Sequence, residues 1–158
     1  MQGMIHHHAQ AIDMVELLKT HTTSDDMKKL GQRIELSQAD EITMMRKWLQ
    51  GHGSASAEAR ASKSGEHAHQ MAGAPMMPGM LAEQEMTRLA AAQGRAFDRL
   101  FLQFMIRHHV GALVMVQDLF ATPGAAQDSD IFAFASDVDA DQRMEIARMS
   151  AMLKELLK

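Results

Sequence analysis

Two adjacent histidine pairs, each preceded by a methionine, are the residues of this sequence best suited to chemistry. Met4 precedes His7 and His8, and the same Met-x-x-His-His spacing recurs over residues 105–109. Because positions i, i+3 and i+4 share one face of a helix, each set converges on one side. Thioether sulfur and neutral imidazole are soft ligands that suit Cu(I) better than Mg²⁺ or Ca²⁺. The spacing therefore predicts two soft-metal ligand sets on two helices.

These ligand sets belong to a longer internal repeat. Residues 4–14 match residues 105–115, and the Gln-x-x-Glu-Ile-x-x-Met segment 38–45 matches 142–149. Both second segments place a glutamate within an apolar stripe, where a carboxylate needs a partner. A glutamate that accepts a hydrogen bond from one ring nitrogen of a facing histidine leaves the other nitrogen free for a metal. We therefore expect the glutamates either to orient the histidines or to bind metal themselves.

Helices must position these residues, because Ala, Leu, Met, Glu, Gln and Arg dominate the sequence. The apolar periodicity predicts helices over about residues 1–20, 25–51, 81–120 and 130–157, with a bend in the third near Gly94. Short connections make two helical hairpins. The predicted fold is all-α, a four-helix bundle built from two repeated hairpins.

The segment between the hairpins differs in kind. Residues 51–79 are rich in Gly, Ser and Pro, show no apolar periodicity, and are predicted to form a flexible linker. We expect the first hairpin over 1–50, this linker, and the second hairpin over 80–158, together forming one bundle. Histidines and methionines in such a tract can capture metal ions and pass them on. They are His52, His67, His69, Met71, Met76, Met77 and Met80.

Composition excludes several classes of protein. With 16 Lys and Arg against 20 Asp and Glu, the net charge of −4 disfavours a nucleic-acid-binding protein. The absence of Cys excludes disulfides, iron–sulfur clusters and thiol nucleophiles, and no apolar run is long enough to span a membrane. Glu-x-x-His occurs once, at Glu66 to His69 in the linker, so a di-iron site lacks its ligands. No catalytic triad or phosphate-binding loop is present, and we predict that the protein is not an enzyme.

The paired motif Met-Ile-x-His-His-x-x-Ala-x-x-Met and Gln-x-x-Glu-Ile-x-x-Met resembles the ferritin-like family catalogued as domain of unknown function, family 305. The resemblance covers residues 2–49 and 97–153. It implies a four-helix bundle, usually in exported bacterial proteins, some of which resemble periplasmic copper-binding and copper-tolerance proteins. The metal ligands that it implies are Met4, His7, His8, Met14, Glu41, Met45, Met105, His108, His109, Met115, Glu145 and Met149.

The two repeats differ in their lead-in. An acidic and aromatic segment, Phe97-Asp98-x-x-Phe101, precedes the second motif, whereas the first repeat starts abruptly at Met1. We therefore expect the chain to be a fragment, or to lack its natural N-terminus and signal peptide.

Two functions are compatible with these patterns. The first is a metal-binding protein for sequestration, tolerance or transfer of copper, with Cu(I) favoured over Cu(II) and zinc as an alternative. The second is a metal-free structural or interaction domain, in which buried His–Glu contacts set the helix register. The resemblance implies a periplasmic or otherwise exported protein. Its partners would be metal ions and a copper-transfer protein, and a homo-oligomer is left open.

Overall fold

A computed structural model describes residues 1–52 and 76–158 of the chain. These residues contain helices and no strand, which confirms the all-α prediction. The predicted linker residues His67, His69 and Met71 lie outside the described residues. The helices are α1 (Gln2–His21), α2 (Asp25–Gly51), α4 (Glu83–Ala91), α5 (Gly94–Ala121) and α6 (Ser129–Leu156).

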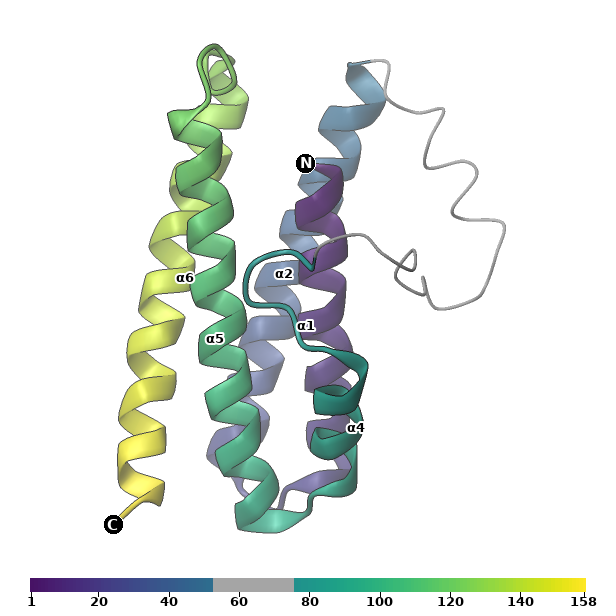
Figure 1. Cartoon of the computed structure of the whole chain (residues 1–158), viewed down its shortest axis with the longest axis vertical. Helices are drawn as coiled ribbons and strands as arrows, with labels where there is room; N and C mark the ends of the chain where they lie inside the picture. The colour runs from purple at the N-terminus through teal and green to yellow at the C-terminus, as the bar shows by residue number, and fades with distance from the viewer. Residues whose placement is uncertain (53–75) are drawn as a thin grey trace.

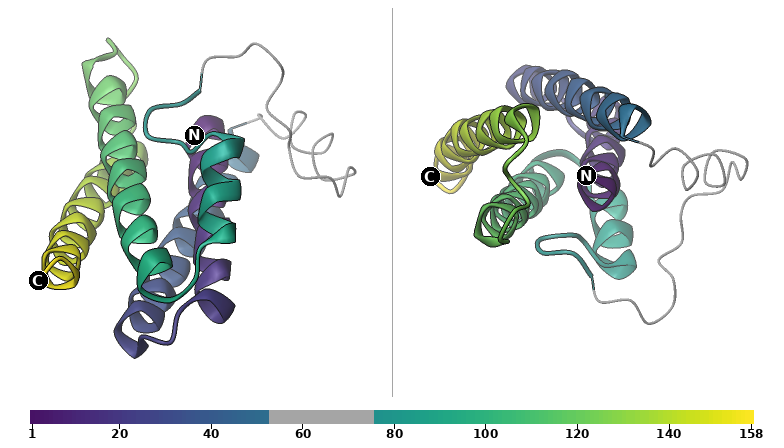
Figure 2. Two further views of the ribbon diagram at one scale, coloured as in Figure 1. Left: turned by 60° about the horizontal axis from the view of Figure 1, so that its bottom comes forward. Right: turned by 90° about the horizontal axis from the view of Figure 1, so that it is seen from above.

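The four long helices form two antiparallel hairpins (Figure 1). α1 packs along α2, and α5 packs along α6; α1 and α5 join the hairpins and also run antiparallel to each other. The short helix α4 contacts both α1 and α5, and the view from above shows it outside the four long helices (Figure 2). None of the described helices is long and apolar enough to cross a membrane.

Side-chain caps begin two of these helices. Oγ of Ser24 accepts a hydrogen bond from the N–H of Met27 at the start of α2. A carboxylate oxygen of Asp128 accepts from the N–H groups of Asp130 and Ile131, each at 3.0 Å, at the start of α6. Such caps satisfy N–H groups that have no partner within the helix.

The single bent helix expected over residues 81–120 is two separate helices, α4 and α5. Ala92 and Gln93 have extended backbones, with ψ of 154° and 153°, so α4 ends at Ala91. Gly94, the first residue of α5, has a φ of 57°, in the left-handed region open to glycine, and the chain reverses there. Arg107 of α5 then donates two hydrogen bonds of 2.7 Å to the carboxylate of Glu85, which ties α4 against α5.

The apolar core consists of two clusters of buried side chains. The lower cluster lies toward the turn between α1 and α2 and includes Leu30, Phe97 and Phe101. The upper cluster lies toward the turn between α5 and α6 and includes Ile42 and Val116. Along both α1 and α5, the histidine pair falls between residues of the two clusters. The core thus frames the histidines from above and below.

We expect a Phe101→Ala substitution to destabilise the protein by about 3–5 kcal/mol, because the Phe101 side chain is fully buried and its loss leaves a cavity. Phe132→Ala is the matched control, since the Phe132 side chain is 55% exposed; its cost should stay below about 1 kcal/mol. Urea unfolding followed by far-UV circular dichroism measures both. Equal losses would contradict this assignment of the core.

Candidate metal centre

The four histidines of the repeated motif meet inside the protein. His7 and His8 lie on α1, His108 and His109 lie on α5, and all four are fully buried. The ring centroids of His7 and His108 are 3.8 Å apart. Within each pair the centroids are 6.3 Å apart, with interplanar angles of 57° and 58°. The sequence repeat is therefore also a geometric repeat, with a pseudo-twofold axis between His7 and His108.

His8 and His109, the outer histidines of the cluster, each contact a glutamate on the other helix of the same hairpin. Nε2 of His8 donates to Glu41 of α2, and Nε2 of His109 donates to Glu145 of α6, the latter at 2.6 Å. A carboxylate only accepts hydrogen bonds, so the ring proton lies on Nε2. Nδ1 of both rings has no hydrogen-bond partner in the described chain, and in the neutral ring it carries the lone pair that a metal-binding histidine uses.

The two inner histidines differ from each other. Nε2 of His7 donates to the backbone carbonyl of Pro78 at 2.9 Å. His108 has no hydrogen-bond partner among the described residues. A buried polar atom without a partner costs about 1–3 kcal/mol, and in native proteins it often marks a bound ion or water. The buried histidine nitrogens without a partner in the described chain are Nδ1 of His7, His8 and His109, and both nitrogens of His108.

Burial keeps the inner pair uncharged. Desolvation lowers the pKa of His7 to about 4, helped by repulsion from neighbouring histidines and opposed by the Pro78 carbonyl. Desolvation also lowers the pKa of His108 well below its usual value, and the nearby imidazoles lower it further. Because neutral imidazole is the form that binds metal, both rings are ready to act as ligands at neutral pH.

The six methionines of the motif divide between the two core clusters, and each cluster draws on both repeats. Met14 of the first repeat joins the lower cluster, because it lies two turns beyond the histidines and α1 runs antiparallel to α5. Met115 of the second repeat packs against the upper cluster for the same reason. The lower set is Met14, Met105 and Met149; the upper set is Met4, Met45 and Met115.

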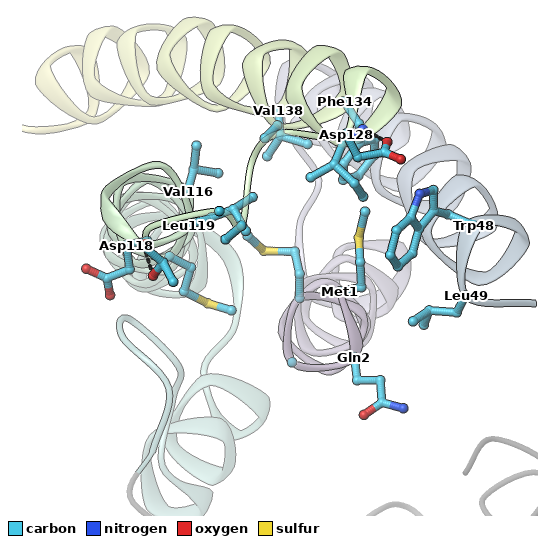
Figure 3. Close-up of a pocket in the computed structure, with 18 residues that line it drawn as sticks. Met1, Gln2, Trp48, Leu49, Val116, Asp118, Leu119, Asp128, Phe134 and Val138 are labelled. Atoms are coloured by element: carbon cyan, nitrogen blue, oxygen red, sulfur yellow. Dashed lines mark hydrogen bonds between the residues drawn. The ribbon is translucent and has the colours of Figure 1, made fainter. Parts of the chain in front are cut away.

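A cavity of about 640 Å³ opens beside the upper methionine set (Figure 3). Met4 and Met115 line it, whereas the three lower methionines are fully buried. The repeat motif gave no signal for this cavity, because its walls come from α1, α2, α5, α6 and the turn after α5. Further lining residues include Met1, Trp48, Asp118, Asp128, Phe134 and Val138.

His52, the histidine of the predicted linker that the structure describes, lies away from the histidine cluster. His52 stacks on Trp48, with ring centroids 4.0 Å apart, and reaches toward Asp128. Met76 is exposed and Met80 is half-buried. The sequence did not reveal the hydrogen bond between His7 and the Pro78 carbonyl. A backbone atom 71 residues away from His7 cannot be recognised in a pattern of side chains.

Among residues 1–52 and 76–158, no three His, Cys, Asp or Glu side chains gather in a way that could hold a metal ion. The two His–Glu contacts are separate pairs, and each glutamate faces the Nε2 atom of its histidine. Methionine sulfur is the further soft donor that the core places near these histidines.

We expect the metal-free protein to lose stability between pH 7 and pH 5. The unfolded chain protonates His7 near its usual pKa of 6.5, whereas the folded protein resists protonation until about pH 4. The stabilisation is therefore present above pH 6.5 and is lost as the pH falls toward 4, by up to about 1.4 kcal/mol per pH unit for this group.

Urea unfolding with a chelator present, at both pH values, measures this loss. His7→Gln removes the titrating ring and keeps an N–H donor for Pro78, so the difference between the two pH values should shrink by about 1–2 kcal/mol. An unchanged difference would show that His7 does not carry the pH dependence.

The family model for the domain of unknown function DUF305 matches residues 1–153 of the chain. A comparison with curated proteins gives no match. Among solved structures, a DUF305 protein from Streptomyces coelicolor, designated a candidate secreted protein, has a TM-score of 0.77 at 24% identity, over 98% of this chain and 90% of that chain. A DUF305 fragment from Deinococcus radiodurans has a TM-score of 0.76 at 27% identity, over 98% and 92%.

The chain is also similar to CopM. The Cu(I)-bound form of CopM gives a TM-score of 0.70 at 26% identity, over 96% of this chain and 91% of that chain. CopM has likewise been solved with Cu(II) and with silver bound. Since the family model spans nearly the whole sequence, this protein belongs to the DUF305 family.

Proposed function

We propose that this protein binds copper ions, Cu(I) in preference to Cu(II), and that it sequesters or transfers them without catalysing a reaction. The observation that carries the proposal is the set of buried ring nitrogens without a partner, enclosed between two sets of methionines. Thioether sulfur and neutral imidazole together form a soft, uncharged donor set. Such a set favours a soft monovalent cation over Mg²⁺, Ca²⁺ or Zn²⁺.

The pseudo-twofold arrangement supports two equivalent sites in each chain. Met4 lies one turn from His7 and His8 on α1, and its counterpart Met105 lies one turn from His108 and His109 on α5. In this proposal each methionine set supplies sulfur ligands and the histidine pair beside it supplies Nδ1. The glutamates orient the outer histidines through Nε2.

Similarity to known proteins supports the same function. The chain belongs to the DUF305 family, and CopM, at 26–27% identity, binds Cu(I), Cu(II) and silver. Export to the periplasm or beyond, implied by the family resemblance, agrees with the designation of the Streptomyces relative as a candidate secreted protein. A copper-transfer protein would then be the physiological partner.

A titration of the reduced, anaerobic protein with Cu(I) against a competing chelator tests the two-site proposal. We expect two ions per chain in the wild type and one in a Met14→Leu, Met105→Leu, Met149→Leu variant, which retains the upper set. Leucine nearly conserves volume, so each change should cost less than about 1.5 kcal/mol. Met27→Leu is the matched control, because Met27 is buried in the same cluster outside the motif. Two ions in the triple variant would contradict the proposed lower site.

His108→Leu separates metal binding from a purely structural role of the histidines. His108 makes no hydrogen bond within the described chain, so an apolar residue should leave the metal-free stability unchanged or raise it by about 1 kcal/mol. Affinity for Cu(I) should fall at least tenfold. His6→Leu, at an exposed position of the same motif, is the control. Loss of stability with full copper affinity would favour the metal-free structural domain instead.

A further inference from the structure

Residues 76–82, which lead into α4, form a strap that lies across α1 and α5 (Figure 1). Three hydrogen bonds join it to α1, two of them to Gln10. The side-chain amide of Gln10 donates to the Leu81 carbonyl at 2.9 Å, and the Leu81 N–H donates to Gln10 Oε1 at 2.7 Å. The third bond runs from Nε2 of His7 to the Pro78 carbonyl. The strap therefore reaches directly into the histidine cluster.

Glycine lets the strap approach α5 this closely. A Cβ atom on Gly111 would lie 1.9 Å from the Pro78 carbonyl oxygen and 2.7 Å from Cα of Gly79, which no side chain allows. Gly79 itself has a φ of 77°, and a Cβ there would lie 2.5 Å from the carbonyl oxygen of Arg107. Backbone packs on backbone at this crossing, so the position of the Pro78 carbonyl is set by α5 as well as by α1.

The strap also breaks the symmetry of the repeat at equivalent positions. With the offset of 101 between the two motifs, Gly111 on α5 corresponds to Gln10 on α1, and His108 corresponds to His7. Gln10 hydrogen-bonds to the strap, whereas Gly111, which has no side chain, leaves room for the strap backbone. As a result, His7 has a partner on Nε2, whereas His108 has none in the described chain.

We propose that the strap is a positioning element of the metal centre: the Pro78 carbonyl holds the ring proton of His7 on Nε2 and so presents Nδ1 to the metal. This inference rests on the proposed copper binding. A backbone carbonyl only accepts hydrogen bonds, so it selects the Nε2–H tautomer. His8 and His109 are held in the same tautomer by Glu41 and Glu145. Pro78 thus does for His7 what the glutamates do for the outer rings.

Strap docking and metal binding must then stabilise each other. If docking raises the affinity of the centre for metal by some factor, bound metal raises the docking equilibrium by the same factor. The alternative, that the strap blocks the site, would require the metal to take Nε2 of His7 in place of Pro78. The shared Nε2–H arrangement of three of the four rings, with Nδ1 free in each, favours positioning.

Gly111→Ala tests the proposal, because it pushes the strap off α5 and leaves every donor side chain in place. Gly51→Ala is the matched control: Gly51 is also helical, and a Cβ there would meet nothing within 4 Å. Gln10→Ala is a second, milder variant, which removes both bonds to Leu81 without a steric clash. All variants are compared with the wild type as full chains.

The first measurement is the long-range ¹H–¹⁵N correlation spectrum of the histidine rings at pH 7, without metal. We expect His7, assigned through His7→Gln, to show the Nε2–H tautomer in the wild type and in Gly51→Ala. In Gly111→Ala the ring should average between its two tautomers, and in Gln10→Ala it should shift in the same direction. A mixed tautomer in the wild type, or no change in Gly111→Ala, would overturn the proposal.

The second measurement is affinity for Ag(I), a redox-stable probe for the same soft site. Affinity should fall about 10–100-fold in Gly111→Ala, the range known for loss of a group that orients a ligand, and stay unchanged in Gly51→Ala. In the wild type, Ag(I) should slow hydrogen exchange of the Leu81 amide. Unchanged or increased affinity in Gly111→Ala would overturn the positioning role. Absence of any metal binding in the wild type would instead refute the proposed function, and the tautomer of His7 would still report separately on the strap.

Discussion

The structure depends on keeping the imidazole rings of His7 and His108 uncharged against each other inside an apolar core. A proton on His7 or His108 would place a charge where no solvent reaches it and where the next ring centroid is 3.8 Å away. Burial lowers the pKa of both residues for that reason. The carboxylates of Glu41 and Glu145 hydrogen-bond to the outer histidines, His8 and His109, and not to this inner pair. The inner pair consequently keeps ring nitrogens that no hydrogen bond in the described chain occupies.

That constraint bears on the methionines that lie above and below the inner histidines. Carboxylates in their place would raise the pKa values of His7 and His108 and favour a buried charge. Methionine is apolar enough to pack with Leu30, Phe97 and Phe101, yet it carries a sulfur atom able to bind a soft cation. One set of side chains can therefore complete the core in the metal-free protein and provide the ligands for the proposed copper sites.

The two hairpins carry equivalent histidines, glutamates and methionines, but the parts of the protein around these residues differ. The upper methionine set lies beside a cavity, whereas the lower set is closed off. The strap reaches only His7, because α1 offers Gln10 as an anchor where α5 offers Gly111. For the two proposed copper sites, this asymmetry means different access to solvent, and a strap contact at His7 that His108 lacks.

The sequence by itself determined the helices, the repeat and the residues that belong together, because helical periodicity and a constant offset are local properties of the chain. It determined the bounds of α1 and α2 closely and indicated that Glu41 and Glu145 face histidines. Only the tertiary structure decided that the methionine sets mix the two repeats, since this follows from the antiparallel packing of α1 on α5. Only the fold could bring the Pro78 carbonyl to His7, because backbone atoms carry no sequence signature and meet through long-range packing alone.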